Sequence, residues 1–192
     1  AREWLLTTGR GSFAAATIAG VNTRKYHGLL VAAPSSPGER FVLLAALADE
    51  VVIDGQATPL ACFEFAGVFH PAGCAHLQRF DHERGEGSVR FVYRVGDGEL
   101  HKRIVVARNA DVVAVRYAWH GRPSGEPTVR VRPMLAMRHY HANRDDASPD
   151  RFVVEADGGS VRVRATDDDR VPAVRLLGDA FEPSPDAWRR FF

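Results

Sequence analysis

The chain has 192 residues, enough for one domain that buries a core without disulfides or metals. Its 25 Lys and Arg residues balance 24 Asp and Glu residues and leave a net charge of +1, which gives no electrostatic basis for binding nucleic acid or an anionic membrane. No apolar run reaches the roughly 18 residues of a transmembrane helix, and the first residues lack the pattern of a signal peptide. We therefore expect a cytoplasmic protein with no nucleic-acid and no membrane partner.

The first long apolar run covers residues 41–48 (FVLLAALA), which have the propensity of a helix. The β-branched continuation at residues 51–53 (VVI) favours a long buried strand instead. Asp54-Gly55 follows directly and is a typical hairpin turn. The sequence therefore predicts a long strand and a hairpin in this part of the chain.

Further strand-like runs at residues 91–95, 100–106 and 112–119 are separated by Gly, Asp and Asn, which predicts a meander. Valine and arginine alternate at residues 129–132 and 161–164, so the valines should lie on one buried face of each strand. Residues 157–159 (DGG) predict another hairpin between residues 151–155 and 160–165. This spacing of short strands indicates an all-β antiparallel sandwich, with no long helix.

Two groups of polar and aromatic residues stand at the ends of apolar runs, at 22–27 (NTRKYH) and 138–141 (RHYH). If residues 24–27 are extended, Arg24 and Tyr26 share one face, and Lys25 and His27 share the other. These groups either bind the polar groups of a ligand and stack on its apolar face, or Arg24 forms a structural ion pair and Tyr26 is a core aromatic. The candidate substrate-binding or interdomain residues are Asn22, Arg24, Tyr26, His27, Arg138, Tyr140 and His141.

Metal and redox chemistry have little support in the sequence. His139 and His141 would share a face of a strand, but no third ligand accompanies them, so we predict no metal and no cofactor. Cys62 and Cys74 lack CxxC spacing and are expected to be two reduced, half-buried thiols.

An ordered series of motifs resembles the N-terminal domain of the archaeal and bacterial type of glycogen debranching enzyme (amylo-α-1,6-glucosidase), from Glu3 to Trp188. The stretches that carry the resemblance are residues 3–9 (EWLLTTG), 11–14 (GSFA), 22–31 (NTRKYHGLLV), 70–73 (HPAG) with 77–80 (LQRF), 100–104 (LHKRI) and 138–141 (RHYH). The resemblance implies an antiparallel β-supersandwich of the galactose-mutarotase-like kind at residues 1–180. Residues 181–192 would then begin a linker to a missing C-terminal catalytic domain in cis.

In that family the catalytic acids lie in an (α/α) barrel, and glycoside hydrolysis needs two carboxyl groups across one bond. The acids Glu50, Glu64 and Asp145 stand in no motif that would mark a general acid or base. The resemblance thus implies a non-catalytic domain that packs on the barrel and contacts an α-glucan such as glycogen or a maltooligosaccharide, and no catalytic residue is predicted.

Two other functions remain open from the sequence. The chain is alternatively an autonomous carbohydrate-binding module, or a sugar isomerase similar to aldose 1-epimerase, which uses a His as acid and a Glu as base. The ordered His, His, Asp and Glu pattern of the epimerases is not recognisable here.

Overall fold

The computed structural model describes residues 2–36, 38–83, 85, 87–122, 124–143 and 151–182, so the expected linker residues 183–192 lie outside them. The strands are β1 (Glu3–Thr7), β2 (Phe13–Thr17), β3 (Gly28–Ser36), β4 (Glu39–Ile53), β5 (Gln56–Pro59), β6 (Cys62–Phe65), β7 (Val68–Ala72), β8 (Leu77–Glu83), β9 (Ser88–Val95), β10 (Gly98–Val106), β11 (Val113–His120), β12 (Thr128–His139), β13 (Phe152–Asp157), β14 (Ser160–Ala165) and β15 (Val174–Leu177). A short 3₁₀ turn, η1 (Gly73–His76), separates β7 from β8. Across the described ranges, no helix has the length and apolar character needed to cross a bilayer.

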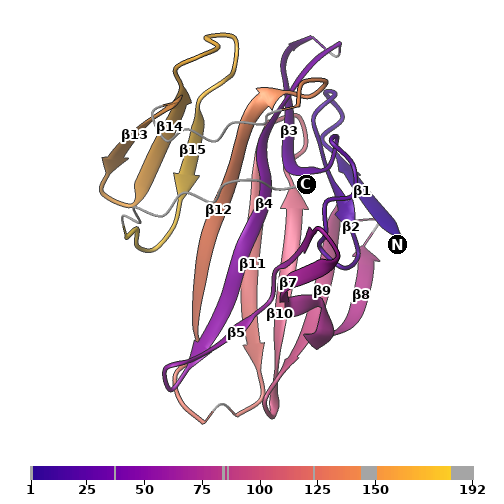
Figure 1. The fold of residues 1–192 in the computed structure, drawn as a ribbon, viewed down its shortest axis with the longest axis vertical. Helices are drawn as coiled ribbons and strands as arrows, with labels where there is room; N and C mark the ends of the chain where they lie inside the picture. Colours follow the sequence, from indigo (N-terminus) through magenta and orange to yellow (C-terminus); the bar gives the residue numbers. More distant parts are fainter. Residues whose placement is uncertain are drawn as a thin grey trace.

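The strands form three antiparallel sheets and one hairpin (Figure 1). The six-stranded sheet has the order β1-β2-β3-β4-β12, with β5 also paired to β4. The second sheet is the meander β11-β10-β9-β8, and the third is β13-β14-β15, which flanks β12 in Figure 1. Among the described residues, strands β6 and β7 pair with each other and with no other strand. The structure confirms the predicted all-β antiparallel fold and the predicted meander.

The ambiguous run at residues 41–48 lies within β4, a strand of 15 residues, so the prediction of a strand is confirmed. Asp54 and Gly55 both have positive φ, 50° and 77°, which gives the twist that a two-residue hairpin between β4 and β5 requires. The predicted hairpin at residues 157–159 is also present, since Asp157 pairs with Ser160 across β13 and β14.

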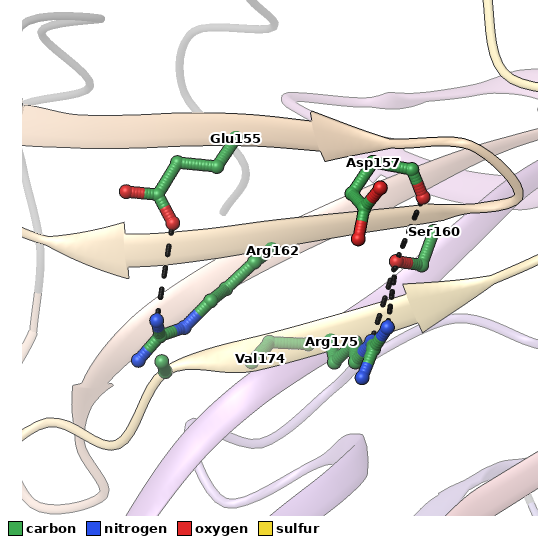
Figure 2. Close-up of a pocket in the computed structure, with 7 residues that line it drawn as sticks. Glu155, Asp157, Ser160, Arg162, Val174 and Arg175 are labelled. Carbon is green, nitrogen blue, oxygen red and sulfur yellow. Dashed lines mark hydrogen bonds and ion pairs between the residues drawn. The ribbon is translucent and has the colours of Figure 1, made fainter.

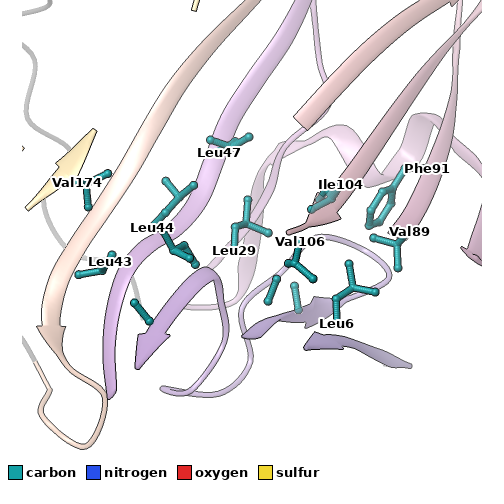
Figure 3. Close-up of a cluster of buried hydrophobic side chains, with 14 of the residues drawn as sticks. Leu6, Leu29, Leu43, Leu44, Leu47, Val89, Phe91, Ile104, Val106 and Val174 are labelled. Atoms are coloured by element: carbon teal, nitrogen blue, oxygen red, sulfur yellow. The ribbon is translucent and has the colours of Figure 1, made fainter. Parts of the chain in front are cut away.

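One core connects all three large sheets. Residues Phe41 to Leu44 of β4 are all buried, and because successive side chains of a strand point to opposite faces, both faces of β4 are covered here. The buried cluster includes Val89 and Ile104 from the meander and Val174 from the third sheet (Figure 3). Val163 of the third sheet belongs to the same cluster. Strand β4 therefore lies between two other layers, which explains its nearly continuous apolar sequence.

The expected burial of alternating valines is confirmed in β14 and is wrong in β12. Val163 is buried, between the exposed Arg162 and Arg164. In β12, Val131 is 40% exposed, although its register partner Asp49 is buried. The reason is that, among the described strands, β12 is the last of its sheet, so no further strand of that sheet covers the outer edge of its first half.

Candidate functional site

The two predicted polar groups meet where β12 ends and β3 begins, and together they form one surface. We call Lys25, Tyr26, Arg138, Tyr140 and His141 the Tyr26–His141 cluster. The Tyr26 hydroxyl lies 3.2 Å from Nδ1 of His141, a residue 115 positions later in the chain. The ammonium group of Lys25 donates to the carbonyl oxygen of His141 at 3.2 Å. Residues that the sequence showed only as separate groups thus contact each other directly.

Arg138 holds the two parts of the cluster together through backbone carbonyls. Its Nη1 atom donates to the carbonyls of His139 and Tyr140, each at 3.3 Å, and of Ala142 at 2.8 Å. Its Nη2 atom donates to the carbonyl of Lys25 at 2.5 Å. The planar guanidinium has five donors in fixed directions, so a single side chain fixes the turn after β12 against the turn before β3.

A β-bulge directs Arg138 into this position. Leu135 pairs with Leu44 and Arg138 pairs with Val42, so β12 advances three residues while β4 advances two. The intervening Met137 is fully buried and has a φ of 43°, in the left-handed region that side chains rarely adopt. Bulges redirect the side chains next to them, and backbone strain of this kind concentrates at functional sites.

The cluster presents aromatic rings beside hydrogen-bond donors. Tyr26 is 37% exposed, and its ring centroid lies 5.4 Å from that of Tyr140. The rings of Tyr140 and His141 are 4.0 Å apart, and the guanidinium of Arg40 lies 5.8 Å from the Tyr140 ring. Such a surface suits a sugar, because the C–H face of a pyranose packs on aromatic rings while its hydroxyls need donors and acceptors. Lys25 lies inside the group at residues 22–27 but was not among the predicted site residues, and Arg40 lies in neither of the two groups.

The predicted strand conformation of residues 24–27 is wrong, because these residues form a turn. The His27 amide donates to the Arg24 carbonyl at 3.0 Å, so Arg24 and Tyr26 do not share the face of a strand. Arg24 instead forms an exposed ion pair with Glu3 at 2.7 Å, and this contact lowers the pKa of Glu3. Arg24 therefore forms the structural ion pair that was the alternative to ligand binding, whereas Tyr26 is exposed and is not a core aromatic.

Asn22 and His27 support this turn from inside. The side-chain amide of Asn22 donates to the Ala45 carbonyl at 2.9 Å. Nδ1 of the buried His27 accepts from the backbone amide of Thr23 at 3.2 Å. Burial lowers the pKa of His27, and Glu3, 3.7 Å from its Nε2 atom, opposes that shift only in part. Of the seven predicted residues, these two are thus placed to hold the turn and are not part of its exposed surface.

Acidification should destabilise the domain through His27. In the unfolded chain His27 has its ordinary pKa near 6.5, and in the folded chain the pKa is lower. Below pH 6.5 the unfolded state therefore binds a proton that the folded state does not bind, and the free energy of unfolding falls. Urea titrations at about pH 7.5 and about pH 5.5 should show a smaller loss for His27→Asn, which keeps an acceptor for Thr23, than for the wild type. An unchanged loss in the variant would contradict this assignment.

A second polar group is buried between the layers. The Asp49 carboxylate of β4 lies 2.6 Å from the Lys102 ammonium of β10 and accepts from the Tyr117 hydroxyl of β11 at 2.7 Å. Burial, and then the nearby Asp49 charge, raises the pKa of Tyr117 well above its ordinary value. The side chain of Asp49 is fully buried, so this group joins the two sheets and is not accessible to a ligand at the surface.

A hollow of about 390 Å³ lies on the outer face of β13–β15 (Figure 2). Three of its charged side chains have partners on the same face: Arg162 lies 3.9 Å from Glu155, and Arg175 donates to the Ser160 hydroxyl at 3.1 Å. None of the described residues that line it is aromatic. The hollow thus fits a sugar less well than the Tyr26–His141 cluster does.

The histidines and acids considered as metal ligands or catalytic groups do not form a metal or catalytic centre among the described residues. Within the described part of the chain, no group of three or more His, Cys, Asp or Glu residues could hold a metal ion. His139 and His141 do not share a face of a strand as expected, because β12 ends at His139 and the His141 amide donates to Nδ1 of His139. Glu50 lies 3.7 Å from Arg130, Glu64 is exposed on β6, and Asp145 lies outside the described residues.

Antiparallel sheets that share one core, with an exposed aromatic and cationic cluster at the ends of two strands, define an all-β sandwich domain with a candidate ligand surface. The model of the family described as glycogen debranching enzyme N terminal matches residues 2–192, and the chain belongs to this family. Comparisons with curated proteins and with solved structures found no match. The family that the motifs indicated is thus confirmed.

Proposed function

We propose that this domain binds α-glucan chains at the Tyr26–His141 cluster and is a non-catalytic part of a glycogen debranching enzyme. The observation that carries the proposal is the convergence of the exposed Tyr26 with Tyr140, His141 and the ammonium group of Lys25. Membership of the debranching-enzyme family supports α-glucan as the ligand.

The cluster is organised before any ligand arrives. Arg138 fixes both turns through four backbone carbonyls, so a glucan chain would meet rings and donors that already hold their positions. Preorganisation lowers the entropy cost of binding, and each hydrogen bond to a sugar hydroxyl then contributes about 0.5–1.5 kcal/mol. Several such contacts support weak binding of a polymer that offers many equivalent sites.

The proposed role places catalysis in another domain. Glycoside hydrolysis needs two carboxyl groups, about 5–9.5 Å apart, on either side of the bond. Glu3 is engaged by Arg24, and the cluster itself consists of cationic and aromatic side chains. We place the catalytic acids in an (α/α) barrel of the same polypeptide, which packs beside the cluster. The contact would include Leu5, an exposed apolar residue of β1 that lies on the same face of the strand as Glu3.

Affinity electrophoresis in gels that contain glycogen tests the glucan site. Tyr26→Ala and His141→Ala should each raise the dissociation constant about tenfold, because each removes a ring and a polar contact. Phe69→Ala, which removes an exposed aromatic on β7, is the matched control and should bind like the wild type. Equal retardation of all four proteins, with unchanged melting temperatures, would rule out this site.

The same preparations separate binding from catalysis. Wild-type protein incubated with a limit dextrin or with α-glucose should release no glucose and should not speed mutarotation. Glucose release that disappears when Glu50 or Glu64 is replaced would place catalytic acids in this domain and overturn its non-catalytic role. Enzyme-dependent mutarotation would favour the sugar isomerase.

A further inference from the structure

The fold brings the two cysteines of the chain into contact. Cys62 is the first residue of β6, and Cys74 is the second residue of η1. The β6–β7 register pairs Cys62 with Ala72, two residues before Cys74. The two Sγ atoms lie 2.7 Å apart, and both cysteines are free thiols.

The backbone, and not only the side-chain rotamers, holds the two thiols together. The Gly73 amide donates to the carbonyl of Ala61 at 2.8 Å. A Cβ atom on Gly73 would lie 2.3 Å from the carbonyl carbon of Leu60 and 2.5 Å from the Ala61 oxygen, so only glycine allows this close approach. Residue 74 is therefore placed next to residue 62 by the path of the chain.

The two sulfur atoms differ in their environment. Cys62 is 1% exposed, whereas Cys74 is only half-buried. Burial, followed by the hydrogen bond with Cys74, raises the pKa of Cys62 to about 12, so its thiol stays protonated in the resting domain. Because the thiolate is the reactive form and exposure governs access, Cys74 is the sulfur that an external reagent reaches first.

We propose that Cys62 and Cys74 form a reversible disulfide by exchange with a small-molecule disulfide such as oxidised glutathione. The Cys74 thiolate attacks one glutathione sulfur, a mixed disulfide forms, and one glutathione thiolate leaves. The Cys62 sulfur then attacks Sγ of Cys74 while its proton passes to the second departing glutathione sulfur. Two protein thiols lose two electrons and two protons, and one glutathione disulfide becomes two thiols.

This bond would close the base of the β6–β7 hairpin. The far end of the hairpin carries Val68 and Phe69, which are 56% and 53% exposed. The hairpin pairs with no other sheet among the described residues, and it is buried only at its base, at Cys62 and Phe63. A cross-link between residues 62 and 74 would restrict the unfolded chain and stabilise the hairpin together with its exposed apolar tip.

Oxidised glutathione added to the folded protein, followed by intact-mass measurement and thiol alkylation, tests the proposal. We expect both thiols to be lost together, with a mass decrease of two hydrogen atoms and no retained glutathione. The melting temperature should rise by about 6–12 °C and return to its initial value with dithiothreitol.

Two single variants test the order of the steps. Cys62→Ser should stop at one glutathione adduct on Cys74, and Cys74→Ser should stay unmodified because its remaining thiol is buried. A stable adduct on the wild type, the absence of any reaction, or modification of Cys74→Ser as fast as of the wild type would each overturn the proposal.

Discussion

Replacing Lys102 with Met should lower the free energy of unfolding by about 3–5 kcal/mol, measured by urea titration. The substitution keeps the length of the apolar stem but removes the ammonium group that lies 2.6 Å from Asp49. The Asp49 carboxylate would remain buried with only the Tyr117 hydroxyl as side-chain partner, because its Oδ1 atom has no hydrogen bond within the described residues. A buried charge that loses its counter-ion is strongly destabilising.

Two further variants identify the cause of that loss. Arg130→Met breaks an exposed ion pair with Glu50, 3.7 Å apart, and should cost less than about 1 kcal/mol. The double variant Asp49→Leu with Lys102→Met removes both buried charges and should be more stable than Lys102→Met alone. If the double variant is the less stable of the two, packing and not the unpaired charge explains the effect.

Replacing Arg138 with Ala should lower the free energy of unfolding by about 2–3 kcal/mol and open the turn after β12. The variant loses every contact between the guanidinium and the carbonyls of His139, Tyr140, Ala142 and Lys25. Hydrogen exchange should show the change directly, because the amides of Tyr140 and Ala142 are hydrogen-bonded in the folded domain. Both amides should exchange faster, while amides in β10 keep their protection.

The geometry of the guanidinium, and not its charge alone, is the expected cause. Arg138→Lys keeps the charge but cannot donate to several carbonyls in one plane, so it should restore only a small part of the protection. Arg162→Ala removes an arginine from the exposed face of β14, 3.9 Å from Glu155, and should leave the Tyr140 and Ala142 amides unchanged. Full protection in Arg138→Lys would show that the positive charge is sufficient.

Much of the fold follows from local sequence rules. Asp54-Gly55 and the glycine pair at residues 158–159 predicted their hairpins because these residue types accept the positive φ that tight turns need. Period-two alternation predicted the buried face of β14. The same rule failed at Val131, because burial of a strand depends on which other elements cover it, and local periodicity contains no information on that cover.

For the candidate site, the sequence predicted residue types better than conformation. The groups at 22–27 and 138–141 were chosen for their density of Arg, Tyr and His, and the structure brings them together. The turn at residues 24–27 was not predicted, because it contains neither Gly nor Pro and is held by tertiary contacts such as that of Asn22 with Ala45. The bulge at Met137 has no sequence signal either, since methionine does not favour positive φ.

The central position of β4 has a consequence for how the domain folds. Strand β4 pairs with β3 and β5, its neighbours in the chain, and with β12, which follows only after the whole β8–β11 meander. Pairing between distant segments must overcome the entropy of closing a long loop, so this step should limit the folding rate. During synthesis, the apolar β4 would present an open edge until β12 emerges, and this edge is the place where an incomplete chain would most readily aggregate.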